Sequence, residues 1–213
     1  MSKISLKHSG GNVVSLNSPT SAPTSADVAF KLPNADGTSG QALVTDASGN
    51  LSFGSTGKIL QVVQTVKTDT FTTTSSSLVD VTGMSAAITP TSTSSKILVQ
   101  VHIGISGGDQ YSYAHYVLLR GSTQIGIGTG ATGSNQTNIS FATNWNTPNE
   151  YIGHAASFQF LDSPSTTSAT TYKLQVKSGY ANKALYVNRV HASYDETYNA
   201  KTASSFTVME VAA

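Results

Sequence analysis

The strongest constraint on the fold is a strict two-residue alternation in the stretch from Lys96 to Ser106. Aliphatic β-branched residues occupy every second position there, namely Ile97, Val99, Val101, Ile103 and Ile105. Successive side chains of an extended strand point to opposite faces of a sheet, so one face of this strand carries all the large apolar groups. The alternation therefore predicts a strand with one face in a hydrophobic core.

Helical patterning is missing from the rest of the chain. No stretch of ten or more residues shows a 3.6-residue apolar period, whereas the two-residue period recurs. Ser and Thr are abundant, there are 18 glycines in 213 residues, and the good helix formers are scarce. This mixture favours strands and turns, so we expect an all-β protein with almost no helix.

From about Gly57 onward, candidate strands are separated by polar loops at intervals typical of an antiparallel sandwich. Two of them flank Arg120-Gly121-Ser122, where glycine permits the positive φ of a hairpin turn. The expected strands are 58–66, 77–82, 96–106, 113–119, 123–128, 139–141, 151–161, 171–177, 184–190 and 206–211. About eight to ten strands predict a jelly roll or a related antiparallel sandwich over residues 58–213.

Residues 1–57 have a different character, with few large apolar side chains. A polar segment of this length can barely build a core of its own. Residues 41–45 and 50–54 face each other across the turn 46–49, which predicts a β-hairpin. Such strands can bury one face when three copies wrap around a shared axis, so we expect an elongated N-terminal stalk.

The charge balance excludes several classes of partner. The 12 Lys and Arg residues offset 11 Asp and Glu residues, so no basic field attracts nucleic acid. No apolar run approaches the roughly 18 residues of a spanning helix, and we expect no membrane insertion. The chain has no cysteine, so disulfides and zinc–thiolate sites are excluded.

Catalytic and metal-binding patterns are also missing from the sequence. The five histidines are His8, His102, His115, His154 and His191, and none of them is paired at close ligand spacing. We therefore expect no metal or cofactor. Cleavage of a polysaccharide needs two acids roughly 5–10 Å apart. Asp195 and Glu196 are adjacent and would point in opposite directions on an extended chain, while Asp109, Glu150 and Asp162 are scattered. We therefore expect a protein that is not an enzyme.

Aromatic and amide side chains gather in three predicted loops, 109–113, 144–151 and 194–199. Flat rings beside amide and acid hydrogen-bonding groups suit the recognition of sugars. The candidate contact residues are Tyr111, Tyr113, Trp145, Asn149, Tyr151 and Tyr198. The alternative for each ring is packing between subunits or over the end of the sandwich.

Residues 11–16, 30–46 and 49–53 resemble the N-terminal stalk of fibre proteins from tailed bacteriophages, notably phages of cyanobacteria and marine bacteria. The likeness lies in the order of Leu32-Pro33, Asp36-Gly37 and Gly40-Gln41, followed by the closing hairpin. Residues 184–189 and 205–211 resemble parts of the C-terminal heads of such fibres. Those heads are similar to jelly rolls of the tumour-necrosis-factor and C1q type, and the resemblance implies a homotrimer.

The resemblance implies a virion protein on the surface of the phage particle. We expect a trimeric fibre or spike whose residues 1–57 dock on the tail or capsid and whose head, residues 58–213, adheres to polysaccharide or protein of the host surface. Because no large adaptor domain of the long-tail-fibre kind precedes the stalk, a capsid decoration or cement spike is the alternative. A polysaccharide-cleaving tailspike is a more remote alternative.

Overall fold

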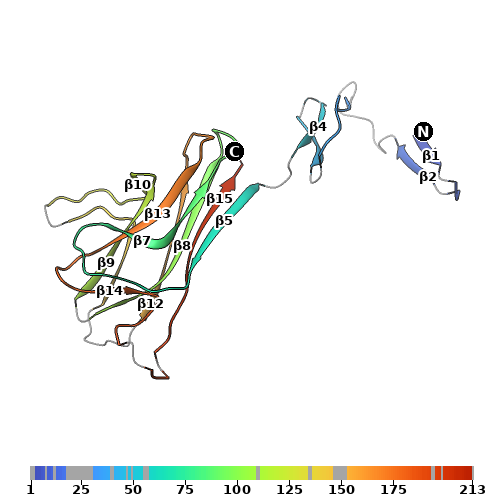
Figure 1. Ribbon diagram of the computed structural model, residues 1–213. Helices are drawn as coiled ribbons and strands as arrows, with labels where there is room; N and C mark the ends of the chain where they lie inside the picture. Colours follow the sequence, from blue (N-terminus) through green and yellow to red (C-terminus); the bar gives the residue numbers. More distant parts are fainter. Residues whose placement is uncertain are drawn as a thin grey trace. The chain divides into compact units, whose positions relative to one another are not determined.

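The computed structural model describes residues 3–7, 9–11, 13–17, 31–38, 41–46, 48, 50–54, 58–108, 111–133, 136–145, 153–192, 195–197 and 199–212. The chain divides into two compact units, residues 1–56 and 57–213 (Figure 1). Every regular element in these described ranges is a strand, so the predicted all-β class is confirmed. A search of the same ranges finds no helix with the length and apolar character needed to cross a bilayer.

Unit 1, residues 1–56, contains two antiparallel pairs. Strand β1 (Lys3–Lys7) pairs with β2 (Val13–Asn17), and β3 (Ala42–Thr45) pairs with β4 (Leu51–Gly54), which confirms the predicted hairpin. The carboxylate of Asp46 accepts hydrogen bonds from the backbone N–H of Ser48 at 2.8 Å and of Asn50 at 3.1 Å. The turn is therefore closed by side-chain chemistry, because Asp binds backbone donors a few residues ahead of it.

Unit 1 leaves large apolar side chains in contact with solvent. Leu32 is 79% exposed, Leu43 51% and Phe53 40%. In the described part of unit 1, no core covers these three side chains. The arrangement of three copies in a stalk remains a prediction.

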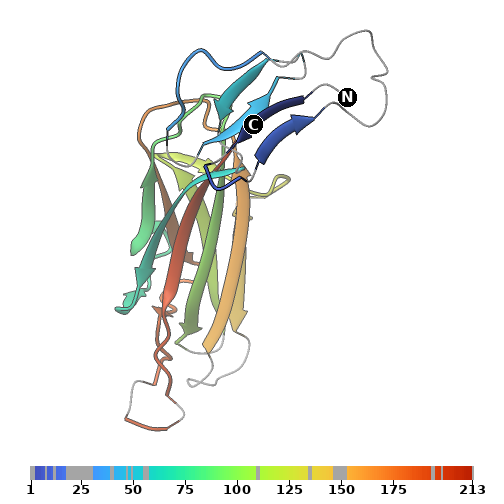
Figure 2. The same ribbon diagram turned by 90° about the vertical axis from the view of Figure 1, so that its right-hand side faces the viewer.

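Unit 2, residues 57–213, is a sandwich of two antiparallel sheets that lie face to face (Figures 1 and 2). The first, the β9 sheet, runs β7–β13–β9, with β10 and β11 both along the far edge of β9. Its strands are β7 (Val79–Ile88), β9 (Ser112–Arg120), β10 (Thr123–Ile125), β11 (Phe141–Trp145) and β13 (Thr170–Ser178). The predicted jelly-roll-like antiparallel sandwich is thus confirmed.

The second sheet, the β8 sheet, runs β5–β15–β8–β12, and two short strands extend it beside β8. Its strands are β5 (Ile59–Lys67), β6 (Phe71–Thr73), β8 (Lys96–Gly107), β12 (Gly153–Asp162), β14 (Leu185–Val187) and β15 (Ser204–Val211). The backbone N–H of Ala212 donates to the carbonyl of Lys58 at 2.8 Å, so β5 begins where β15 ends. We call this the Lys58 end of unit 2.

The core lies between the two sheets. The five alternating residues of β8, from Ile97 to Ile105, are at most 2% exposed, as the two-residue period predicts. The β9 sheet contributes fully buried residues from two strands, among them Tyr116, Leu118, Tyr172 and Leu174. Each such side chain contributes about 1.5–3 kcal/mol through removal of apolar surface from water.

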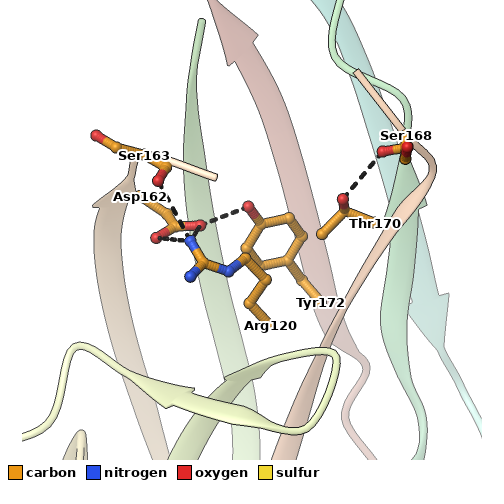
Figure 3. Close-up of polar contacts among 6 residues, drawn as sticks. All are labelled: Arg120, Asp162, Ser163, Ser168, Thr170 and Tyr172. Atoms are coloured by element: carbon orange, nitrogen blue, oxygen red, sulfur yellow. Dashed lines mark hydrogen bonds and ion pairs between the residues drawn. The ribbon is translucent and has the colours of Figure 1, made fainter. Parts of the chain in front are cut away.

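A buried carboxylate joins the two sheets near the Lys58 end (Figure 3). One guanidinium nitrogen of Arg120, at the end of β9, donates to both Asp162 oxygens at 2.9 Å, and the Tyr172 hydroxyl donates to one of them at 2.7 Å. Burial raises the pKa of Tyr172, and the hydrogen bond to Asp162 raises it further. Asp162, one of the scattered acids of the sequence, therefore has a structural role.

A second buried acid anchors the loop between β7 and β8. Glu210 is 0% exposed, and its carboxylate accepts hydrogen bonds from the Gln61 amide at 2.6 Å and from both the backbone N–H and the hydroxyl of Thr91 at 2.7 Å. Burial opposes ionisation, but the hydrogen bonds from Gln61, Ser95 and Thr91 outweigh it and lower the pKa of Glu210 to about 2. Glu210 is charged at neutral pH because its acceptor sites are filled.

Several strand boundaries differ from expectation, among them those of β7 and β11; β10 and β14 are each shorter than expected, and β6 (Phe71–Thr73) was not expected. β7 extends to Ile88 because Gly83, at φ 83°, accommodates a bend opposite the register shift in β13. β11 covers residues 141–145 and not 139–141, since Phe141 stacks on Tyr116 with ring centroids 4.3 Å apart. β6 has three residues, too few to show a period.

Candidate functional site

The candidate site lies at the end of unit 2 remote from Lys58. Strand β8 runs from Lys96, paired with Val211 at the Lys58 end, to Gly107, paired with Leu185 at the other end. Its 12 residues separate the two ends by roughly 35–40 Å. Strands β8, β11 and β13 end at this remote end and β14 begins there, and we call it the loop end.

Two exposed tyrosine rings lie close together at the loop end. Tyr111 is 46% exposed and Tyr180 is 54% exposed, and their ring centroids are 6.5 Å apart with planes tilted by 32°. Tyr111 has a φ of 68°, a conformation that side chains other than glycine adopt uncommonly. Its backbone N–H donates to the carbonyl of Trp145 at 2.9 Å, which fixes the loop against β11. Local strain of this kind often accompanies a functional position.

Backbone hydrogen bonds hold the two tyrosine loops together. Gly108 donates its N–H to the carbonyl of Ala184 at 2.8 Å, and Gly179 donates to the carbonyl of Tyr113 at 2.8 Å. A Cβ atom added at Gly179 would lie 2.7 Å from the His115 ring, so this close approach requires glycine. Tyr111 and Tyr180 are therefore presented on a rigid base.

The other predicted contact residues lie in strands or outside the described residues. Trp145 does not lie on a loop: it is the last residue of β11, it is 3% exposed, and its ring meets His154 edge-on at 5.3 Å. This fits the alternative of packing over the end of the core, because burial of the large indole outweighs display in a loop. Tyr113 is half-buried within β9. Asn149, Tyr151 and Tyr198 lie outside the described residues.

Sequence reasoning missed a second aromatic cluster at the same end. The Tyr186 ring is stacked on His191 at 5.1 Å, and the guanidinium carbon of Arg189 lies 4.1 Å from the Tyr186 ring centre. These residues are brought together by a sharp bend at the buried Asn188, whose φ is 62°. Tyr186, Arg189 and His191 follow no strand or helix period in the sequence, so the sequence alone did not predict this cluster.

The bend at Asn188 is fixed by an internal polar network. Its side-chain amide donates to the carbonyls of Lys67 and Asp69, both at 2.9 Å, and its side-chain oxygen accepts from the Ser204 hydroxyl at 2.5 Å. Both polar atoms of this buried side chain are therefore hydrogen-bonded, and Asn188 has a structural role.

A cleft of about 260 Å³ lies beside the Arg189 segment. Its polar lining comes from His102, His154, Arg189 and Thr202, and its floor is formed by small or apolar residues such as Gly104 and Val190. A concave apolar floor with a few polar groups at the rim suits a small part of a larger ligand, such as one sugar substituent.

The groups described at the loop end suit non-covalent binding. The described part of the chain contains no group of three or more His, Asp or Glu residues placed to hold a metal ion. Asp195 and Glu196 are exposed neighbours, and Asp109 and Glu150 lie outside the described residues. The observed groups are aromatic rings, one guanidinium and backbone amides, which bind flat or polar ligands by stacking and hydrogen bonding.

Comparison with known proteins yields only distant structural likeness. No protein-family model matches the chain, and no curated protein matches its sequence. Among solved structures, that of infectious bursal disease virus Gt strain is similar at 14% identity and a TM-score of 0.38, over 80% of this chain and 42% of the viral chain. The structure of the Gx strain is similar at 15% identity and a TM-score of 0.34, over 80% of this chain and 41% of the viral chain. The structure of a mutant VP2 protein of this virus is similar at 14% identity and a TM-score of 0.33, over 80% of this chain and 41% of the viral chain. The chain therefore spans about two fifths of the viral chains that it matches.

Proposed function

We propose that this chain is a non-enzymatic structural protein of a phage particle, a homotrimeric fibre or spike that attaches the particle to polysaccharide or protein on the host surface. Residues 1–57 form the stalk that docks on the tail or capsid, and residues 58–213 form the head. The loop end of the head makes the contact with the host.

The observation that carries this proposal is the exposed Tyr111–Tyr180 pair at the loop end. The chain reaches unit 2 at Lys58, at the opposite end of the sandwich, so these rings lie on the end remote from the point where the stalk joins. Exposed aromatic rings held by a rigid scaffold are the usual anchors of a binding surface. Aromatic faces also stack on the apolar faces of sugar rings.

Multivalency would supply the strength of attachment. A pair of half-exposed rings buries little surface and gives weak affinity for one head. Three heads in one spike, and many spikes on one particle, convert later binding events into intramolecular ones, so that avidity can exceed the single-site affinity by about 10²–10⁴-fold. A weak site thus suffices for adhesion.

The test uses full-length protein labelled with a fluorophore and cells of the bacterium that the source phage infects. Wild-type protein should bind the cells and should compete with adsorption of the phage. Tyr111→Ala combined with Tyr180→Ala should reduce the apparent affinity at least tenfold, because every head of the oligomer loses its anchor.

The matched control is Thr123→Ala combined with Gln124→Ala, two exposed positions on β10 near the Lys58 end. The control should bind as the wild type does. Wild-type protein that neither binds nor competes would overturn the proposal, and so would equal binding by the tyrosine variant.

A second candidate function is capsid decoration, which the exposed Leu32, Leu43 and Phe53 of unit 1 favour. These side chains offer an apolar surface for docking on a capsid shell. Gold-tagged antibody against residues 58–213 should label the tail under the tail-fibre form of the proposal and the capsid under decoration. Particles that lack the protein should lose resistance to heat in the second case and lose host adsorption in the first.

A further inference from the structure

The outer face of the β8 sheet, which points away from the core, is unusually apolar. Four of the large hydrophobic residues that are exposed in the described chain lie on its strands: Ile59 at 47%, Val62 at 57%, Val66 at 54% and Leu161 at 47%. Exposed apolar side chains scattered singly need no explanation, but a contiguous set on one flat face marks a contact surface.

The strand register arranges this face in rows that cross four strands. One row contains Val62 of β5, Met209 of β15, Leu98 of β8 and Leu161 of β12. The next row, two residues further along each strand, contains Gln64, Thr207, Gln100 and Gln159. An apolar row thus borders a row of amide and hydroxyl groups, and a shallow groove of about 520 Å³ lies over the second row.

Part of the amide row retains unused hydrogen-bonding capacity. The Gln64 amide donates to the Thr207 hydroxyl at 2.8 Å. Gln100 and Gln159 face each other on adjacent strands, and neither side chain bonds to any described residue. Each amide can both donate and accept, so these two side chains can bond to a copy of themselves.

The two outer faces of the sandwich differ in charge. On the β9 sheet, Lys173 pairs with Asp80 at 2.9 Å, Gln175 donates to Asp80 at 2.7 Å, and Lys177 donates to Thr137 at 3.0 Å. On the outer face of β5, β15, β8 and β12, strands that are described throughout, Lys96 is the one Lys, Arg, Asp or Glu side chain, and it lies at the Lys58 end. A neutral face can meet its own copy without like-charge repulsion.

We infer that this face, formed by β5, β15, β8 and β12, packs against a neighbouring copy of the chain. The assignment rests on the homo-oligomer in the proposed function and names the surface that would form it. The apolar row is removed from water, and Gln100 and Gln159 bond across the contact. The loop end remains free for the host surface.

The size of the face is adequate for a specific contact. Four strands about 4.8 Å apart and eight residues rising about 3.3 Å each cover roughly 19 by 26 Å, or about 500 Å² in projection. The accessible area of a corrugated surface exceeds its projection, and a standard interface takes about 800 Å² from each partner. The face therefore supplies most of a standard interface.

The first test measures the mass of the full chain by sedimentation. Wild-type protein should be an oligomer, and Val62→Lys combined with Leu161→Lys should raise the dissociation constant roughly a hundredfold or more by placing unpaired charges in the contact. The control, Thr82→Lys combined with Ala87→Lys, adds the same charge at exposed positions of β7 and should leave the mass unchanged. Circular dichroism checks that each variant is folded.

The outcomes separate this inference from the proposed function. An oligomer that withstands Val62→Lys with Leu161→Lys would overturn the assigned face and leave the adhesive oligomer in place. A wild type that is monomeric at tens of micromolar would overturn both. A wild-type oligomer that fails to bind host cells would count against adhesion alone and would leave the assigned face in place.

A second test does not depend on a disruptive substitution. The chain has no cysteine, so Gln100→Cys or Ala87→Cys introduces a unique thiol at a position exposed in the single chain. In the oligomer, Cys at 100 should react with a maleimide at least tenfold more slowly than Cys at 87. Equal rates would overturn the inference, as would a protected thiol at 100 in a monomer, which would mean that the chain's own residues 1–56 cover the face.

Discussion

Replacing Glu210 with glutamine should make the stability of unit 2 less sensitive to acid. The folded-state pKa of Glu210 is about 2 against an ordinary value of 4.5, a difference of about 2.5 units. One unit corresponds to about 1.4 kcal/mol, so the ionised carboxylate contributes about 3 kcal/mol to the free energy of unfolding. A depressed pKa stabilises the fold above the unfolded-state value. The contribution is therefore complete above about pH 5 and is lost as the pH falls toward 2.

The assay is urea unfolding of the full chain between pH 7 and pH 2 at one fixed protein concentration, since oligomerisation makes apparent stability depend on concentration. Glu210→Gln should be about 3 kcal/mol less stable than the wild type at pH 7, because an amide cannot accept all the bonds from Gln61 and Thr91. The difference between the two proteins should shrink steadily below pH 5.

Glu196→Gln is the matched control, since Glu196 is exposed. This variant should follow the wild-type curve, apart from a few tenths of a kcal/mol. If wild type and Glu210→Gln lose stability in parallel between pH 5 and pH 2, the hydrogen bonds of Glu210 do not depress its pKa, and the reasoning is refuted.

Three further substitutions test the interior of unit 2. Tyr172→Phe removes one hydrogen-bond donor to Asp162 and should lower the free energy of unfolding by about 1 kcal/mol. Arg120→Ala leaves a buried carboxylate without its cation and should lower it by about 3 kcal/mol. Equal urea midpoints for the two variants would contradict this ranking. Gly104→Ala places a Cβ against the Thr202 hydroxyl and should cost about 1–3 kcal/mol. Thr202→Gly in the same chain should restore part of the melting temperature, and a loss that the second change leaves untouched would point to another cause.

The alternation of apolar residues carried most of the fold prediction. β8 and β13 were located within a residue or two, because each has one face in the core and the period is therefore imposed on every second residue. The β3–β4 hairpin was predicted from two short segments that face each other across a turn, and the Asp46 side chain closes that turn. β11 was misplaced because its boundaries are set by the stacking of Phe141 on Tyr116, a contact between strands far apart in sequence.

The candidate site was predictable only in part. Tyr111 is exposed, as expected for a loop residue, whereas Trp145 lies buried at the end of β11 against His154. Tyr180 and the Arg189–Tyr186 pair were missed. Their proximity depends on the left-handed bend at Asn188 and on the backbone bonds between loops, neither of which leaves a period in the sequence.

The sequence by itself determined that the chain is all-β and which residues of the longest strands face inward, and it predicts that residues 1–57 lack a core. These properties follow from local periodicity and composition. Only the tertiary structure decided which strands are neighbours, and hence that Val62, Leu98, Leu161 and Met209 form one exposed row. Strand order depends on pairing between distant segments, and the outward-facing residues that define a surface are not held to any pattern by the core.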